Sequence, residues 1–396
     1  MANKNGGFIG TDGLDAPDPP TAVTPTAGDA QVSVAFTAPT DTGTSAITGF
    51  VAQVSTDGTN YSAGSNTGSS SPIVVSSLTN DTAATAKVWA INAYGTSAPS
   101  DASASFTPVQ LQRGLFAGGS NAAGTNQNVI EQIQIATTAN ATDFGDLSAA
   151  CLFGSGSGSD TRSVFSLGNT GSVVDIIEYV AIATAGNSTD FGNLSLARDN
   201  TAGLSSATRA IFAGGQEGNG KTIDYITIAN TGNATDFGDL TRAGVDPSGA
   251  GSTTRGLFFG RYGSSAEDVI DYITISSAGN ATDFGNLNTA HYQSGAVSSN
   301  TRAVVGGGSS GGEINEMSYV TIASAGNTTD FGDLTSARAL TRGVSSKVRG
   351  VFGGGFSGNV IDYITIASTG DATDFGDHTA AIKGQSESSS AHGGIA

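Results

Sequence analysis

Hydrophobic and polar residues alternate in short runs along most of the chain, which is typical of β-strands with one buried face. Between residues 18 and 108 the clearest runs are Val32–Phe36, Ile47–Val54 and Ala86–Ile91. Turn signals such as Asp57-Gly58 and Asn80-Asp81 lie between them. Short strands at this spacing predict a β-sandwich over residues 18–108. Residues 1–17 show no periodicity, and we expect them to form an extended arm.

From residue 109 to residue 396 the alternation follows a repeat of 44 to 47 residues. The sequence Thr-Asp-Phe-Gly returns six times, and its aspartates are Asp143, Asp190, Asp236, Asp283, Asp330 and Asp374. Each period also holds an arginine before small and apolar residues, at Arg113, Arg162, Arg209, Arg255, Arg302 and Arg349. A third element is an apolar, acidic and aromatic run such as Ile223–Ile228. Several short strands in each of six such periods predict a six-bladed β-propeller.

Closure of this ring can also be inferred from the sequence. The first repeat begins at its second strand, near Arg113, so its first strand is missing. The tail at residues 383–396 is rich in small residues and is similar to that missing strand. Gln110–Gln112 is a competing source for the strand. We favour the tail, because a C-terminal strand would close the ring and leave no free sheet edge.

The segment from residue 18 to residue 108 carries several motifs that belong together: Pro19-Pro20, Ile47–Phe50, Leu78–Asn80 and Asn92–Ser100. With these motifs it resembles a fibronectin type III domain. Phe36 stands where that family usually has Trp, and Ala84 stands where it usually has Tyr. Loss of this Tyr removes the tyrosine-corner hydrogen bond, so we expect a less stable domain. The resemblance implies a spacer or an adhesive module.

The repeats combine an Ala-Arg pair, paired glycines, a tyrosine and a final aromatic residue. The paired glycines are Gly118-Gly119, Gly214-Gly215, Gly307-Gly308 and Gly354-Gly355, and the tyrosines are Tyr179, Tyr225, Tyr272, Tyr319 and Tyr363. This order resembles the kelch repeat. The phenylalanines of the Thr-Asp-Phe-Gly motifs stand where kelch repeats have Trp, and Gln132 replaces the first tyrosine. The resemblance therefore implies a kelch-like propeller.

Charge narrows the classes of partner. The 396 residues include 16 basic and 34 acidic ones, giving a net charge of −18. Such a balance argues against nucleic acid and against an anionic membrane surface, both of which attract Lys and Arg. The N-terminus lacks the apolar core of a signal peptide, and no run of 18 apolar residues occurs. We expect neither a secretory signal nor a transmembrane segment.

The repeated arginines and aspartates are the first candidates for chemistry. Because they recur with the repeat, we interpret them as structural pairs or as donors to loop carbonyls. A catalytic site would require the symmetry to be broken at one place, and no such place is evident in the sequence. We therefore assign no catalytic residue and expect no enzyme.

Metal and cofactor sites are also not expected. The Gly-Asn-Ala-Thr-Asp turns have oxygen ligands that suit calcium, but Asn and Asp cap turns with the same atoms. His291, His378 and His392 lack the spacing of a zinc site. Cys151 is the only cysteine, and we interpret it as a small apolar strand residue. No metal, cofactor or ligand-binding residue is assigned.

Fibronectin-type domains and Asp-Phe-Gly-rich repeats occur together in virion proteins of tailed bacteriophages from marine hosts, which this chain resembles over nearly its whole length. The resemblance implies a tail-fibre, tail-tip or capsid-decorating protein that assembles in the host cytoplasm. Its N-terminal region would contact other virion proteins, and its propeller would contact a host-surface glycan or receptor. A homo-oligomer within a larger assembly is expected. The alternatives are a carbohydrate-active propeller enzyme and a cellular surface adhesin.

Overall fold

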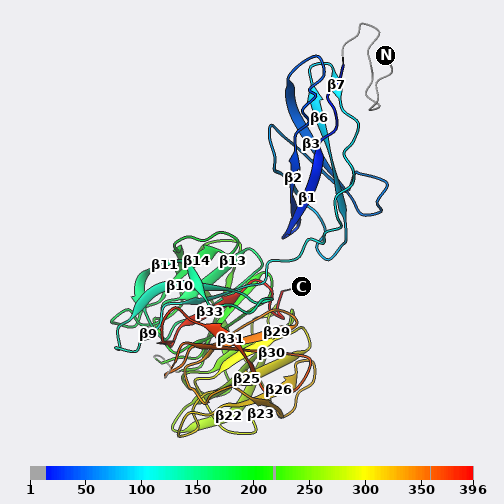
Figure 1. Cartoon of the computed structure of the whole chain (residues 1–396). Coiled ribbons are helices and arrows are strands. Elements are labelled where there is room, and N and C mark those ends of the chain that lie inside the picture. Colours follow the sequence, from blue (N-terminus) through cyan, green and yellow to red (C-terminus); the bar gives the residue numbers. More distant parts are fainter. Residues whose placement is uncertain (1–14, 217–219, 357, 396) are drawn as a thin grey trace. The chain divides into compact units, whose positions relative to one another are not determined.

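A computed structural model describes residues 15–216, 220–356 and 358–395. The described residues contain β-strands and turns but no helix, so the chain is all-β, as predicted. It divides into two compact units, Met1–Leu111 and Gln112–Ala396, called unit 1 and unit 2 (Figure 1). Residues 1–14 of the expected N-terminal arm lie outside the described residues. Residues 15–17 do not continue an arm, because Ala16 is buried and Asn92 donates a hydrogen bond to the Asp15 carbonyl.

Unit 1 consists of two antiparallel sheets. One has the order β1-β2-β5, formed by β1 (Thr21–Gly28), β2 (Gln31–Thr37) and β5 (Ile73–Ser76). The other has the order β4-β3-β6-β7, formed by β4 (Gly64–Gly68), β3 (Ile47–Ser55), β6 (Thr85–Asn92) and β7 (Gly95–Thr96). Alternate residues of β2, β3 and β6 enter one shared hydrophobic core. Trp89 lies on the opposite face of β6, edge-on to Tyr61.

Unit 2 contains six four-stranded antiparallel sheets, one for each repeat. Sheets 2 to 6 each use four consecutive strands. Sheet 2 comprises β12 (Ser155–Gly158), β13 (Arg162–Ser166), β14 (Ile176–Ala181) and β15 (Thr189–Asn193); sheet 3 comprises β16 (Ala202–Ser205), β17 (Arg209–Ala213), β18 (Thr222–Thr227) and β19 (Thr235–Asp239). Sheet 4 comprises β20 (Ser248–Gly251), β21 (Arg255–Tyr262), β22 (Ala266–Thr274) and β23 (Thr282–Asn286). Sheet 5 comprises β24 (Gly295–Ser298), β25 (Arg302–Gly306), β26 (Glu316–Thr321) and β27 (Thr329–Asp333); sheet 6 comprises β28 (Arg342–Ser345), β29 (Arg349–Gly353), β30 (Val360–Thr365) and β31 (Thr373–Asp377).

Sheet 1 joins the two ends of unit 2. Its order is β33-β8-β10-β11, formed by β33 (Ser386–Ser389), β8 (Arg113–Ala117), β10 (Gln127–Gln134) and β11 (Thr142–Cys151). Ser386 pairs with Ala117 and Ser389 pairs with Gly114, so the strand beside β8 comes from the C-terminal tail. A short ladder between β9 (Ser120–Asn121) and β32 (Ile382–Lys383) adds a second link between these ends.

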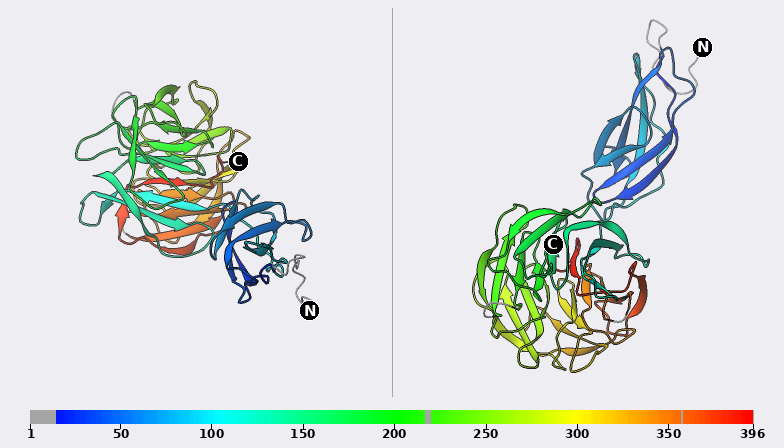
Figure 2. Two further views of the ribbon diagram at one scale, coloured as in Figure 1. Left: turned by 90° about the horizontal axis from the view of Figure 1, so that it is seen from above. Right: turned by 90° about the vertical axis from the view of Figure 1, so that its left-hand side faces the viewer.

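The first strands of the six sheets lie next to one another in a cycle, in the order β33, β12, β16, β20, β24, β28 and back to β33 (Figure 2). Glycines permit this close approach. A Cβ atom added to Gly203 would lie 2.0 Å from the carbonyl oxygen of Gly156, and one on Gly156 would lie 2.1 Å from that of Glu387. The small residues that mark these strands in the sequence therefore set how closely the sheets pack.

Hydrophobic clusters occupy the junctions between consecutive sheets. The junction between sheets 6 and 1 has its own cluster, in which Phe116 and Ile133 pack with Val351 and Phe375. In five repeats the tyrosine of the third strand stands edge-on to the motif phenylalanine, with ring centroids 5.9 to 6.1 Å apart. A motif phenylalanine thus lies in the hydrophobic cluster of each junction, and in five junctions a partly buried tyrosine packs against that cluster.

Candidate functional site

The six repeated arginines hold neighbouring sheets together. Each guanidinium donates from Nη1 to an isoleucine carbonyl of the next sheet, over 2.5 to 3.0 Å. In five repeats it also lies over the tyrosine of its own sheet, 4.2 to 4.7 Å from the ring centroid. None of the ion pairs between described residues joins these arginines to the motif aspartates. Of the two interpretations drawn from the sequence, the carbonyl bonds are therefore the ones present.

The Asn turns join the same sheets. At five of the six junctions an Asn Oδ1 accepts the backbone N–H at the end of the preceding sheet, and Asp371 does so at the remaining one. These distances are all 3.0 to 3.1 Å. Among the described residues, no group of three or more His, Cys, Asp or Glu side chains could hold a metal ion. These side chains therefore bond to the preceding sheet rather than only capping their own turns.

A second set of polar residues is buried inside the sheets and was not identified from the sequence. Acidic side chains of the third strands form three buried ion pairs, Arg198–Asp224 at 3.0 Å, Arg261–Asp271 at 2.7 Å and Arg338–Asp362 at 2.8 Å, and Glu131 is hydrogen-bonded to His378 at 2.6 Å. The basic residue of the pair does not stand at the same position in every repeat, so a comparison of the repeats does not reveal these pairs. Gly244 aligns with Arg198, and the Arg261 side chain from β21 occupies the space that this glycine leaves.

Cys151 stands at the position that Arg198 and Arg338 occupy in later repeats. Its thiol is buried, and burial together with the nearby Glu178 raises the pKa of Cys151 to about 12. A thiol with such a pKa is not a nucleophile near neutral pH. Burial lowers the pKa of His291. His378 is hydrogen-bonded to Glu131. Burial raises the pKa of Glu131, but its hydrogen bonds with His378 and Thr379 lower that pKa by more, so the net shift is downward.

The symmetry of the repeats is broken along the axis of unit 2. Arg342 and Glu387 are the only charged residues in the six first strands, and they lie in neighbouring strands, β28 and β33. Arg342 Nε lies 3.4 Å from Glu387 Oε2 and donates a hydrogen bond to the Gln385 carbonyl. In the sequence, Arg342 and Glu387 are charged residues among small ones, which could have indicated this break in symmetry, but sequence analysis did not identify them.

One end of the axis is ringed by six residues with left-handed backbone, one before each first strand. They are Phe153, Asn200, Asp246, Gln293, Leu340 and Gly384, with φ between 55° and 67°. Five consecutive backbone N–H to carbonyl bonds connect them. Asp246 is 6% exposed and accepts a hydrogen bond from Gln293. Burial raises the pKa of Asp246 to about 6, although Arg342 and Gln293 oppose the rise.

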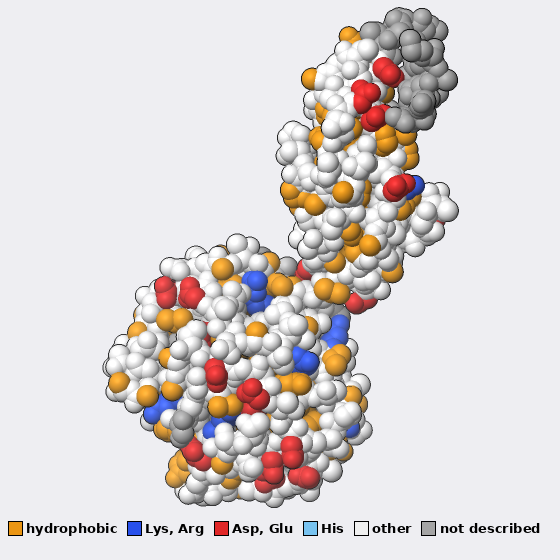
Figure 3. Space-filling view, viewed as in Figure 1, with side chains coloured by type: hydrophobic (Ala, Val, Ile, Leu, Met, Phe, Trp, Pro, Cys, Tyr) orange, Lys and Arg blue, Asp and Glu red, His pale blue; other side chains and the backbone are white. Residues whose placement is uncertain are grey.

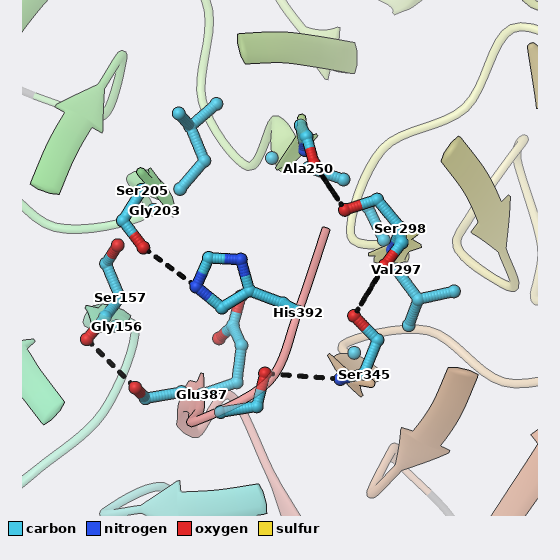
Figure 4. A pocket seen from close by; sticks show the side chains of 17 residues that line it. Gly156, Ser157, Gly203, Ser205, Ala250, Val297, Ser298, Ser345, Glu387 and His392 are labelled. Carbon is cyan, nitrogen blue, oxygen red and sulfur yellow. Dashed lines mark hydrogen bonds between the residues drawn. The ribbon is translucent and has the colours of Figure 1, made fainter. Parts of the chain in front are cut away.

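The channel along the axis encloses only about 50 Å³ (Figure 4). It is lined by glycines and by serine hydroxyls such as Ser205, Ser298 and Ser345, which bond to carbonyls of the preceding strands. Glu387 and His392 also line it. At roughly 10–15 Å³ for each water molecule, this volume admits a few waters. It has no room for a sugar ring.

His392 belongs to the C-terminal tail, which crosses the other end of the channel. Its Nε2 lies 3.2 Å from the Gly158 carbonyl and 3.0 Å from Ser205 Oγ, and the carbonyl requires Nε2 to carry a proton. Nδ1 is then free to accept the Gly394 N–H at 3.0 Å. Burial lowers the pKa of His392 to about 4, although the bond to the Gly158 carbonyl opposes the change. Burial raises the pKa of Glu387 to about 7, with Arg342 opposing.

The tail also connects sheets that are distant in sequence. Ser390 exchanges hydrogen bonds with Arg113 of sheet 1, and Ala391 bridges to Ser346 of sheet 6. Gly393 N–H donates to the Ser298 carbonyl of sheet 5. The end of the channel is therefore covered by the chain itself.

Comparisons with known proteins identify no family. No family model matches the chain, and no curated protein matches it. Among solved structures, a crystal structure of a run of titin domains is similar to 24% of this chain at 26% identity, with a TM-score of 0.23. The match spans 33% of the titin chain. No helix in the described residues is long and apolar enough to cross a membrane.

Proposed function

We propose that unit 1 is a fibronectin type III-like β-sandwich and that unit 2 is a six-bladed kelch-like β-propeller. Two sheets that share one core support the first assignment. Six four-stranded sheets whose first strands form a cycle support the second. The strand from the C-terminal tail in sheet 1 supports closure of the ring, since it leaves β8 paired on both sides.

The protein acts, in this proposal, as a non-enzymatic structural component of a bacteriophage virion. It is a tail-fibre, tail-tip or capsid-decorating protein that presents its propeller to a host-surface glycan or receptor. The observation that carries the proposal is the use of the repeated polar groups. The arginines and turn asparagines bond one sheet to the next, and the narrow channel is lined by the chain's own Glu387 and His392. These features favour a rigid display scaffold over a catalytic cavity.

The surface supports the same role. Only 13% of residues are charged, and Figure 3 shows acidic and basic side chains scattered among neutral polar and hydrophobic ones. Such a surface suits contacts made through hydroxyl, amide and backbone groups. Unit 1, which includes the N-terminal residues, would attach the protein to the virion, and copies would assemble as a homo-oligomer there.

Electron microscopy of the particle from which the protein is purified tests this proposal. We expect copies on a tail or capsid surface, with the N-terminal region toward the particle and the propeller outward. A parallel adsorption assay would compare particles with and without antibody bound to unit 2. A free soluble protein absent from particles, or adsorption unchanged by saturating antibody, would contradict the virion role or the adhesive role respectively.

A further inference from the structure

A groove of about 290 Å³ opens between sheets 3 and 4 of unit 2. One wall is the loop from β16 to β17, with Ser206, Thr208 and Arg209. The other wall includes Thr253 and Ser276 of the fourth repeat. Gly394 of the C-terminal tail also lines it. The groove is almost six times larger than the channel and approaches the low end of the range for small-molecule sites.

Arg209 gives this groove a positive charge without an acidic partner. Its Nη1 donates to the Ile275 carbonyl at 2.8 Å, and its guanidinium lies 4.3 Å from the centroid of the Tyr225 ring. No ion pair and no further guanidinium hydrogen bond of Arg209 occurs among the described residues. A guanidinium presents five N–H donors in a fixed plane. The remaining donors are therefore available to an anion held in the groove.

Hydroxyl groups surround this charge. Ser206 Oγ accepts the backbone N–H groups of Thr208 and Arg209, so its own proton is free to be donated. Thr208, Thr253 and Ser276 are exposed and line the groove, Thr208 on one wall and the other two on the opposite wall. Hydroxyls both donate and accept hydrogen bonds, which matches the hydroxyls of a sugar.

Two features distinguish this junction from its symmetry equivalents. Ala207 leaves space where the corresponding loops have Asp160, Asn300 or Lys347. The tail passes here at Gly394, where an added Cβ would lie 1.8 Å from the Ser205 carbonyl oxygen. The groove is thus shaped by a small loop residue on one side and by the tail on the other.

We infer that this groove binds an acidic sugar residue, a pyranose bearing a carboxylate. The carboxylate would pair with the Arg209 guanidinium in the planar geometry that such pairs favour, while Ser and Thr hydroxyls on both walls would bond the ring hydroxyls. The net charge of −18 disfavours anions at long range, but at 0.1 M salt it is screened beyond about 10 Å. This inference names the ligand class for the proposed adhesive role and rests on that role.

The test compares two sugars on the full-length protein by isothermal titration calorimetry: methyl glucuronoside, which carries a carboxylate, and methyl glucoside, which does not. We expect the acidic sugar to bind at least tenfold more tightly.

Thr253→Trp should fill the groove and abolish binding, whereas Asn300→Trp, at the same loop position one repeat later, should preserve it. Arg209→Gln should weaken binding, whereas Arg302→Gln removes an equivalent link between sheets and should not.

Equal affinity for the two sugars would overturn the inference. So would an equal loss of binding in Thr253→Trp and Asn300→Trp, or in Arg209→Gln and Arg302→Gln. Sodium acetate and sodium phosphate serve as further probes. If either competes as well as methyl glucuronoside, the groove recognises a free anion rather than a sugar, and the inference fails. Adhesion of particles that is unaffected by Thr253→Trp would place the adhesive surface elsewhere and leave the virion role intact. Sugar binding in the groove by a protein absent from virions would leave the site intact and contradict the virion role.

Discussion

Replacing His392 or Glu387 should change how the stability of unit 2 depends on pH, in opposite directions. His392 has a folded-state pKa of about 4 against an ordinary value of 6.5. Between these pH values the unfolded chain binds a proton that the folded chain does not. The free energy of unfolding therefore falls as pH falls through this window. At about 1.4 kcal/mol for each pH unit, the loss is about 3 kcal/mol.

Glu387 works against this loss. Its folded-state pKa is about 7 against an ordinary value of 4.5, so the folded chain takes up a proton first as pH falls. The free energy of unfolding therefore rises between pH 7 and pH 4.5, again by about 3 kcal/mol. Because the two groups line the same channel and titrate over nearly the same range, their contributions offset each other in the native protein.

Single substitutions separate the two contributions. In Glu387→Gln the effect of His392 remains alone, so stability should fall toward pH 4.5 by about 3 kcal/mol relative to the native chain. In His392→Gln the Glu387 effect remains, and stability should rise by a similar amount toward acid pH. The double variant should follow the pH profile of the native chain. Loss of the Arg342–Glu387 contact adds an offset to Glu387→Gln but not a slope of this sign.

Urea unfolding at a series of pH values, followed by far-ultraviolet circular dichroism, measures these differences. Trp89 is the only tryptophan and lies in unit 1, so its fluorescence reports unfolding of that unit and provides an internal control. The two single variants should leave the fluorescence transition unchanged. Difference curves that are flat, or that slope in the same direction, would refute the reasoning from burial and hydrogen bonding at these two side chains.

Three further predictions concern the ring of sheets. Removing residues 385–396 deletes the C-terminal strand that pairs with β8, and should lower the melting temperature of unit 2 by about 10 °C, at 2–4 °C for each kcal/mol lost. Trp89 fluorescence should show that unit 1 is unaffected. An unchanged calorimetric transition of unit 2 would contradict closure by the tail. Gly203→Ala places a Cβ 2.0 Å from a neighbouring carbonyl oxygen and should cost about 2 kcal/mol or more in urea unfolding. Gly186→Ala, which meets nothing within 4 Å, is its control, and equal stability of the two variants would argue against close packing at the axis. Asn280→Ala removes the acceptor for an N–H group of the preceding sheet and should cost about 1 kcal/mol in the same assay, whereas no cost would mean that water replaces this bond.

Much of the local structure could be predicted from the sequence. The alternating run in Val32–Phe36 lies in β2, and the run in Ile47–Val54 lies in β3. The Thr-Asp-Phe-Gly motifs form the last strands of the six repeats, and the small-residue tail supplies β33. These features follow from residues close in sequence, whose periodicity directly reflects which face of a strand is buried.

The polar residues were only partly predictable. Repetition indicated that residues such as Arg209 have a structural role, and the structure shows their bond to a carbonyl of the next sheet. Repetition could not indicate the buried ion pairs, because the arginine that contacts each third-strand aspartate stands at different positions in different repeats. Arg198 pairs with its acid from the segment between sheets, whereas Arg261 does so from within β21. An alignment of the repeats therefore does not reveal an interaction in which one partner does not stand at the same position in every repeat.

The sequence by itself therefore determined the all-β class, the period of the repeat and the structural role of the repeated arginines. Each of these depends on a local environment that recurs six times. Only the tertiary structure decided what lies at the axis and at the groove. Arg342 contacts Glu387, and Glu387 and His392 line the same channel, because the C-terminal tail pairs beside sheet 6 and crosses the end of the channel. Arg209 and Gly394 are 185 residues apart, and they share a groove because packing, rather than periodicity, sets the path of the tail.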